Sequence, residues 1–180
     1  ATFFVTGCVL KNELMWRDHL AYAADFLFRS QFDRQVEFLN AIQNSKDWSY
    51  AEFIARSQAL CENFGIPTGE AIIDECSPYM SVPCIKDLLE CGHDVGLHSQ
   101  SHPYFPNLTC DEAVDEVLQN YATLKDNVQK EPLAFSFPFG ARHPESAFYT
   151  KVAQQTNVEY FCGINANMCS NSSDSNPAFA

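Results

Sequence analysis

Residues 94–102, DVGLHSQSH, are the stretch on which the interpretation of this sequence depends. The run from Asp94 to His98 is short, largely apolar and preceded by Gly92, which predicts a buried β-strand. After it, His98 and His102 stand four residues apart. If the segment between them makes a single helical turn, both imidazoles can reach one divalent ion. The stretch therefore predicts a strand that leads into a candidate metal site.

Working outward, other short apolar segments predict further strands of the same sheet. These segments are Thr2 to Thr6, Leu133 to Phe137 and Val158 to Cys162. Helices are predicted between the strands, from Ser81 to Cys91, from the capping box at Thr109 to Glu112 onward, and from about Glu145 to Gln155. Because strands alternate with helices, the pattern favours a parallel sheet with helical crossovers.

The region between the first strand and Cys84 is predicted to be mostly helical. Apolar spacing and a capping box at Ser49 predict helices over Glu13 to Arg29, Phe32 to Asn44 and Ser49 to Phe64. Ala71 to Ile73 is predicted as a short strand or turn. The aromatic residues of this region could line a sugar groove, but aromatics at helical spacing are more often core, and core is favoured for Trp16, Tyr22, Phe26, Trp48 and Tyr50. The Asn- and Ser-rich end, Asn165 to Ala180, is predicted to be loop or a frayed terminus.

Composition narrows the class of protein. The chain has 180 residues, of which 46% are hydrophobic, enough for one sizeable core. A formal net charge of −12 without any basic tract argues against nucleic acid as a partner. No apolar run approaches the roughly 20 residues that cross a bilayer. The oligomeric state is not predicted.

Eight cysteines without a C-x-x-C pair disfavour a zinc ribbon, and reduced structural cysteines are favoured over disulfides. The first residues, Ala1 to Val5, resemble a core strand rather than a signal peptide, so a cytoplasmic location is favoured over secretion.

The spacing of His98 and His102 is a weak signal by itself, because a histidine also caps helices or satisfies a core hydrogen bond. A metalloprotease motif is excluded, since Ser99 stands where it needs a glutamate. Position strengthens the metal reading: Phe139 and Gly140 follow the next predicted strand, and the carboxyl ends of parallel strands form one face where sites assemble.

Three stretches make the sequence resemble the polysaccharide deacetylases, which share a NodB-like domain. They are ATFFVTG at 1–7, CGHDVGLHSQSHP at 91–103 and FSFPFG at 135–140, in the order of the family. The resemblance frames residues 1 to about 163. It implies an α/β fold, a partial (β/α) barrel of parallel strands with an inserted helical segment. The whole chain, 1–180, would form a single domain with that insertion at about 10–84.

The resemblance also implies roles for individual residues. His98 and His102 would be ligands of a divalent metal, with zinc the expected ion, while His93 would be structural. The backbone N–H of Phe139 would help hold the oxyanion, and Pro138 and Phe139 would contact substrate. Ser136 stands where many members have an arginine that orients the catalytic aspartate. This departure puts the positioning of that aspartate in doubt.

The function implied is metal-dependent removal of N-acetyl groups from a polysaccharide or oligosaccharide. The family's third ligand and base are two adjacent aspartates before its first matching strand, and its acid is a histidine in a late motif; neither occurs in residues 1–180. Asp74 and Glu75 are a disfavoured substitute, because acidic pairs are usually solvated. The chain alone is therefore predicted to have little or no activity. The alternative is a non-catalytic carbohydrate-binding or structural relative.

Overall fold

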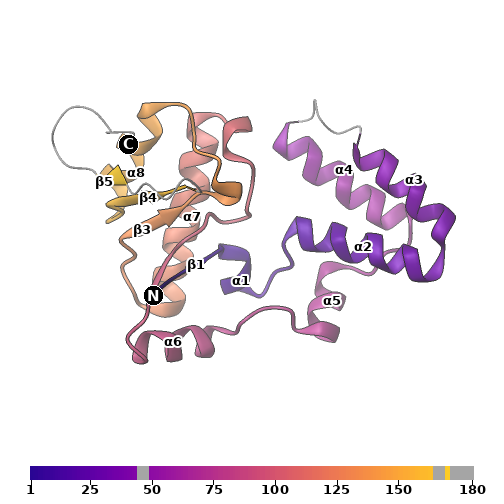
Figure 1. Ribbon diagram of the computed structural model, residues 1–180, viewed down its shortest axis with the longest axis horizontal. Coiled ribbons are helices and arrows are strands. Elements are labelled where there is room, and N and C mark those ends of the chain that lie inside the picture. Colours follow the sequence, from indigo (N-terminus) through magenta and orange to yellow (C-terminus); the bar gives the residue numbers. More distant parts are fainter. Residues whose placement is uncertain (44–48, 164–168, 171–180) are drawn as a thin grey trace. The chain divides into compact units, whose positions relative to one another are not determined.

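The computed structural model describes residues 1–43, 49–163 and 169–170. The chain forms two compact units (Figure 1). The first, here the sheet unit, comprises Ala1–Asn12 and Tyr79–Ala180. The second, here the helical unit, comprises Glu13–Pro78. The helical insertion expected at about 10–84 stays a prediction.

The sheet unit is built on five strands in the order β1-β2-β3-β4-β5. Strands β1 to β4 are parallel, and β5 is antiparallel to β4. Their bounds are Thr2–Val5, Asp94–Leu97, Ala134–Ser136, Tyr160–Cys162 and Cys169–Ser170. The predicted α/β fold of parallel strands and helices is confirmed. The strand β5 was not predicted. Its pairing with β4 is made by backbone hydrogen bonds, and its Asn- and Ser-rich surroundings show no apolar run that would indicate a strand.

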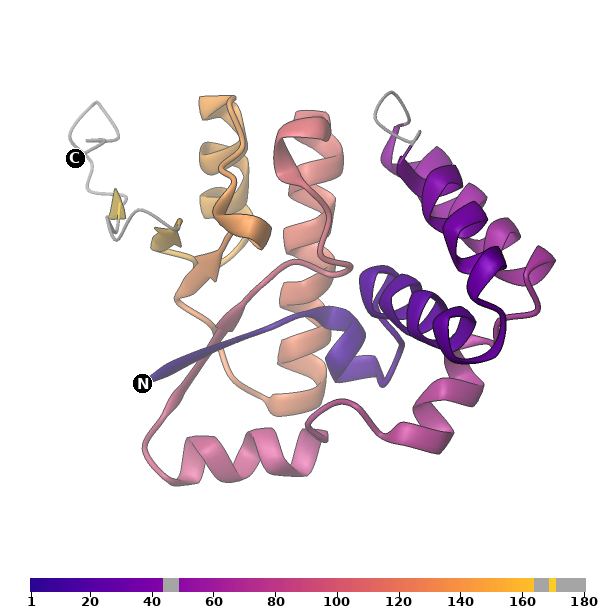
Figure 2. The ribbon, with the colours of Figure 1, turned by 45° about the vertical axis from the view of Figure 1, so that its right-hand side comes forward.

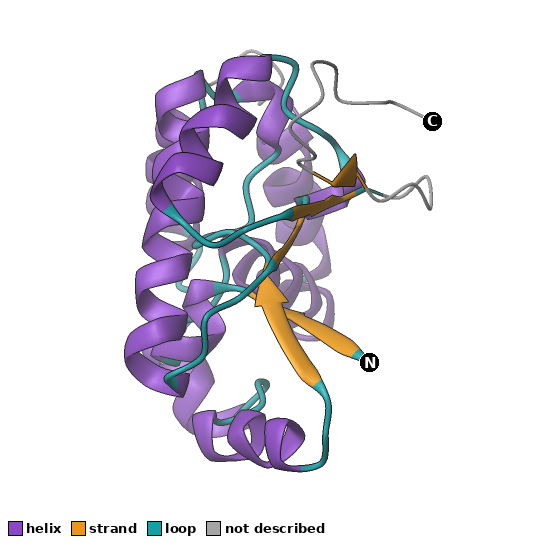
Figure 3. Ribbon diagram, turned by 90° about the vertical axis from the view of Figure 1, so that its left-hand side faces the viewer, coloured by secondary structure: helices purple, strands orange, loops and turns teal. Residues whose placement is uncertain are grey.

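Strands β1 and β2 lie side by side, and their register sets the position of the loops that follow (Figure 3). Val5 pairs with Leu97, and Leu97 pairs with Phe135 on β3. Three strands therefore end at the same edge of the sheet, directly before the segments that carry His98 and Phe139.

Gly96 is a glycine because its neighbours leave no room for a side chain. A Cβ at this position would lie 2.7 Å from Cδ1 of Phe4 and 2.9 Å from the backbone oxygen of Ala134. Real Cβ atoms do not approach other atoms so closely, and the contact to Ala134 is to the backbone of the neighbouring strand. The close packing of β2 between β1 and β3 thus depends on this residue.

Helices cover the sheet and connect its strands. In the sheet unit they are α1 (Gly7–Lys11), α6 (Val82–Glu90), α7 (Cys110–Val128) and α8 (Ser146–Gln155), with 3-10 turns η1 (Phe105–Asn107) and η2 (Pro138–Gly140). The predicted capping box that begins α7 is present, with Thr109 and Glu112 bonded to each other's backbone N–H. Helix α7 packs beside α8 and also contacts α1 and β2 (Figure 2). The one-turn helix α1 was not predicted, because five residues are too few to show a helical period.

The core of the sheet unit is strongly aromatic. Its five phenylalanines are each no more than 2% exposed: Phe105, Phe135, Phe137, Phe148 and Phe161. The rings of Phe135 and Phe137 lie 4.9 Å apart between centroids, edge to face. Such rings bury large areas and pack in specific geometries, which fixes β3 and β4 against α8.

The helical unit contains α2 (Trp16–Ser30), α3 (Phe32–Gln43), α4 (Tyr50–Asn63) and α5 (Gly69–Cys76). Its core centres on Leu27, Phe38 and Cys61, and Tyr22 and Phe26 pack against that core. Trp48 lies outside the described residues. The prediction of a strand or turn at Ala71 to Ile73 is wrong: Thr68 caps α5, and Ile72 and Ile73 are buried on its inner face. A short apolar run does not distinguish a strand from a helix of two turns.

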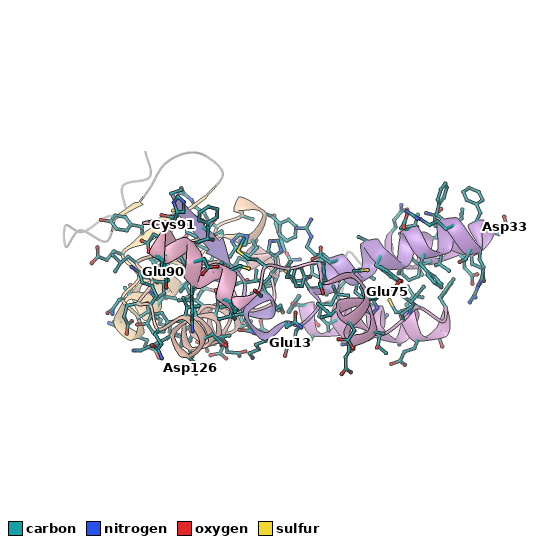
Figure 4. All side chains as sticks on the ribbon, turned by 90° about the horizontal axis from the view of Figure 1, so that it is seen from below. Glu13, Asp33, Glu75, Glu90, Cys91 and Asp126 are labelled. Atoms are coloured by element: carbon teal, nitrogen blue, oxygen red, sulfur yellow. The ribbon has the colours of Figure 1, made fainter. Side chains whose placement is uncertain are left out.

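The cysteines of residues 1–43 and 49–163 form no disulfide with one another. Burial raises the pKa of the Cys61 thiol to about 11, so it stays protonated and packs as a small hydrophobe. Cys91 is exposed just after α6 (Figure 4). In the part of the chain that the structure describes, no helix is long and apolar enough to cross a membrane.

Gly96→Ala tests the close packing of the sheet. Because the new methyl group meets both a ring and a backbone carbonyl, we expect a loss of about 1–3 kcal/mol in the free energy of unfolding, measured by urea denaturation. Removing the Phe4 ring relieves only one of the two clashes. The Gly96→Ala substitution should therefore cost less free energy of unfolding in a Phe4→Ala background than in the wild type, but its cost should not vanish. A Gly96→Ala variant as stable as the wild type would contradict this account.

Candidate functional site

The loop that follows β2 brings His98 and His102 together. Their ring centroids are 4.9 Å apart, and the ring planes are inclined by 70°. The segment does not form the single helical turn that the spacing argument assumed, because Ser99 and His102 have left-handed backbones with φ of 66° and 62°. The Ser99 hydroxyl accepts a hydrogen bond of 3.0 Å from the backbone N–H of His102, which closes the loop. The two imidazoles thus meet by a strained loop rather than by helical periodicity.

A hydrogen bond to the next strand sets the orientation of the His98 ring. Its Nδ1 lies 2.7 Å from the backbone oxygen of Ser136, at the end of β3. Because a carbonyl oxygen can only accept, Nδ1 carries the proton, and in the neutral ring Nε2 carries the lone pair. Histidines that bind metals commonly donate their other N–H in this way. The main chain of Ser136 makes this bond, so its side chain does not decide the ring's orientation.

Phe139 joins the two histidines from the turn after β3. Its backbone is left-handed, with φ of 56°, and its ring is 42% exposed. The Phe139 ring lies 4.8 Å from the His102 ring and 6.2 Å from that of Tyr104, between centroids. Pro138 is buried beneath this turn. The roles of Pro138 and Phe139 towards substrate stay predictions, and Tyr104 is a neighbour that the sequence analysis missed.

The start of α1 holds the loop from one side. The backbone N–H groups of Gly7 and Cys8 donate to the carbonyl oxygens of Ser99 and Gln100, each at 3.0 Å. A Cβ on Gly7 would lie 1.8 Å from Oε1 of Gln100, which is itself buried. A side chain at position 7 would therefore require the buried amide of Gln100 to move.

Helix α7 holds the loop from the other side. Oδ1 of Asn120 accepts a hydrogen bond of 2.9 Å from the backbone N–H of His98. One turn earlier, the Glu116 carboxylate accepts from the backbone N–H and the hydroxyl of Ser101, at 2.9 and 2.6 Å. The sequence analysis missed both residues. The only sequence signal for them is that two polar residues, one helical turn apart, stand among the apolar positions of a long helix. Asn120 is fully buried, and buried polar side chains need hydrogen-bond partners.

Burial raises the pKa of the Glu116 carboxyl, although hydrogen bonds from Ser101, Gln100 and Ser99 act in the opposite direction. Desolvation penalises the charged form, and here it outweighs the donors that stabilise it. The loop is thus held by a half-buried acid that is charged less readily than an exposed glutamate.

The other candidate residues lie elsewhere. Asp74 and Glu75 belong to α5 of the helical unit and are exposed, with Glu75 seen in Figure 4. Asp94 caps its neighbour's backbone and pairs with Lys130 at 3.3 Å. His93 precedes β2, with its ring 5.4 Å from that of Phe3. Among residues whose positions are described, no group of three or more His, Cys, Asp or Glu side chains could hold a metal ion.

Comparison with known proteins identifies one family. Residues 1–161 match the family model described as Polysaccharide deacetylase. The comparison with curated proteins gives no match.

Three solved structures are among those that this chain matches. BA3943, a CE4 family pseudoenzyme from Bacillus anthracis, has 20% identity over 45% of this chain and 28% of its own, with a TM-score of 0.39. The peptidoglycan deacetylase PdaC from Bacillus subtilis has 21% identity over 42% and 35%, with a TM-score of 0.35. The Streptococcus pyogenes deacetylase PplD has 12% identity over 94% and 83%, with a TM-score of 0.46. The chain thus spans about a third of the length of BA3943 and of PdaC.

The pH dependence of stability tests the burial of Glu116. Folding raises the pKa of Glu116 above its unfolded value of about 4.3. At a pH between the unfolded and the folded pKa, the folded protein therefore binds more protons at this group than the unfolded chain does. Stability should therefore fall as the pH rises through this window, and Glu116→Gln should lack that contribution. In urea unfolding, we expect the wild type to lose stability relative to Glu116→Gln as the pH rises above about 4.3. A difference that stays constant over this range would contradict the raised pKa.

Proposed function

The chain belongs to the polysaccharide deacetylase family, and on that premise we propose that it removes N-acetyl groups from a carbohydrate with a divalent metal held by His98 and His102. The observation that carries this proposal is the meeting of the two imidazoles, 4.9 Å apart between centroids, at the carboxyl end of β2. In parallel α/β folds this edge of the sheet is where sites assemble. Zinc is the ion we expect, because it favours imidazole nitrogen among its ligands.

The fit of the residues to a metal rests on the donor set. The Ser136 carbonyl, 2.7 Å from Nδ1 of His98, fixes which nitrogen of that ring carries the lone pair. Zinc also needs a third protein ligand, and hydrolysis needs a base. In the family two adjacent aspartates take these roles. The described part of the chain brings no such carboxylate to the two histidines.

A bound divalent ion would polarise the acetamide carbonyl and lower the pKa of a bound water towards neutrality. The chain itself would orient both histidines. It would also direct the backbone N–H of Phe139, whose backbone is left-handed, at the carbonyl oxygen of the acetamide. The half-exposed rings of Tyr104 and Phe139 would offer an apolar surface to the acetylated sugar. With these roles, we expect the substrate to bind beside His102, against which the Phe139 ring packs.

Metal titration of single histidine variants tests the site. In His98→Ala and in His102→Ala, the zinc affinity measured by calorimetry should fall. Loss of a residue that only supports a ligand costs roughly 10–100-fold in metal affinity, and loss of a ligand should cost at least as much. His93→Ala is the matched control, because His93 lies at the opposite end of β2, and this variant should bind like the wild type. Unchanged binding in both His98→Ala and His102→Ala would remove the site.

Acetate release distinguishes the two functions that remain. Protein that contains residues 1–180 together with any flanking sequence its gene encodes should release acetate from chitooligosaccharide, and a chelator should abolish the release. Residues 1–180 alone are expected to release little or none. Zinc binding through His98 and His102 without acetate release from the longer of these proteins would instead support a non-catalytic carbohydrate-binding relative.

A further inference from the structure

One carboxylate on α7 holds the loop between the two histidines. Oε2 of Glu116 accepts from the backbone N–H of Ser101 at 2.9 Å, and Oε1 accepts from its hydroxyl at 2.6 Å. The backbone oxygen of Glu116 also accepts from the N–H of Gln100 at 3.0 Å. Glu116 therefore takes three hydrogen bonds from two consecutive loop residues, directly before His102. Hydrogen bonds to a charged acceptor are about twice as strong as neutral ones.

The loop needs such anchoring because its backbone is strained. Ser99 and His102 both have left-handed backbones, which are unfavourable for non-glycine residues and persist only where the surrounding structure enforces them. Glu116 and Asn120 enforce it at the two ends of the loop, since Asn120 binds the N–H of His98 and Glu116 binds Ser101. Four residues of a helix advance by about 6 Å. Helix α7 thus fixes the distance between Asn120, which binds the backbone of His98, and Glu116, which binds the residue before His102.

We propose that Glu116 is a positioning residue for the metal site, which sets the separation of the His98 and His102 imidazoles through Ser101. This inference rests on the proposed function, because it takes the two histidines to be ligands. A carboxylate suits the role, since it accepts from the N–H and the hydroxyl at once. A glutamine keeps both contacts, because its oxygen accepts the N–H while its amide donates to the hydroxyl oxygen. Alanine loses both.

Four variants of the full chain separate positioning from general stability. Glu116→Ala removes both contacts, and Glu116→Gln is the conservative rescue. Asp115→Ala removes an exposed acid of the same charge from the neighbouring position on α7. Val117→Ala removes a fully buried side chain from the same helix and destabilises the fold while keeping the Glu116 carboxylate.

Cobalt(II) is the probe, because its visible absorption reports the geometry of its ligands. We expect Glu116→Ala to weaken Co²⁺ binding by about 10–100-fold and to change the spectrum of the bound ion, as loss of an outer-shell partner does. Glu116→Gln, Asp115→Ala and Val117→Ala should bind within a few-fold of the wild type. Wild-type affinity and spectrum in Glu116→Ala would overturn the inference while leaving the histidine site intact.

Hydrogen exchange of the metal-free protein gives a second, independent readout. The backbone N–H groups of Ser101 and His102 should exchange faster in Glu116→Ala than in Val117→Ala, because only the former loses the anchor of the loop. Equal exchange rates in the two variants would overturn the inference. If the wild type bound no Co²⁺ at all, the proposed function would fail, and this exchange comparison would still decide whether Glu116 holds the loop.

Discussion

The geometry of the candidate site depends on a network of hydrogen bonds that holds residues 98–102 in a strained conformation. Backbone N–H groups of α1 bind the loop's carbonyls, and two side chains of α7 bind its N–H groups. Left-handed backbone at non-glycine residues is stable only when the surroundings over-determine it, and such strain gathers at functional sites. The loop therefore obtains its shape from α1, which lies far from it in sequence, and from α7, which follows it, and the two imidazoles meet as a result.

The sheet makes this network possible by bringing its contributors to one edge. The register of β1, β2 and β3 places Gly7, His98 and the turn with Phe139 after three adjacent strand ends. Two glycines allow the necessary close approach, Gly96 within the sheet and Gly7 at the start of α1. The Ser136 carbonyl then sets the ring of His98 from the third strand. Fold and site are thus coupled, because each of these strands supplies a contact that fixes the loop.

Local signals in the sequence predicted much of the fold but little of what shapes the loop. Capping boxes and apolar runs placed α4, α7 and the parallel strands correctly, because those patterns act within a few residues. The short α5 was misread, since Ile72 and Ile73 fit either a strand or a helix. The helical turn expected at His98 to His102 is absent, and Glu116 was missed, because its partner Ser101 is fifteen residues away. Contacts over that range depend on the tertiary fold, which a local pattern does not encode.

These contacts give the two histidines the features of metal ligands: proximity, one ring orientation fixed by a carbonyl, and a rigid support. Family membership supports the proposed class of reaction, and the geometry supports the proposed metal site at His98 and His102. The central claim is that one ion binds both imidazoles. X-ray absorption spectroscopy of the zinc-loaded protein tests it most directly. We predict two imidazole nitrogens at about 2.0–2.1 Å from zinc. A spectrum with no imidazole shell, or one unchanged in His98→Ala, would contradict the account.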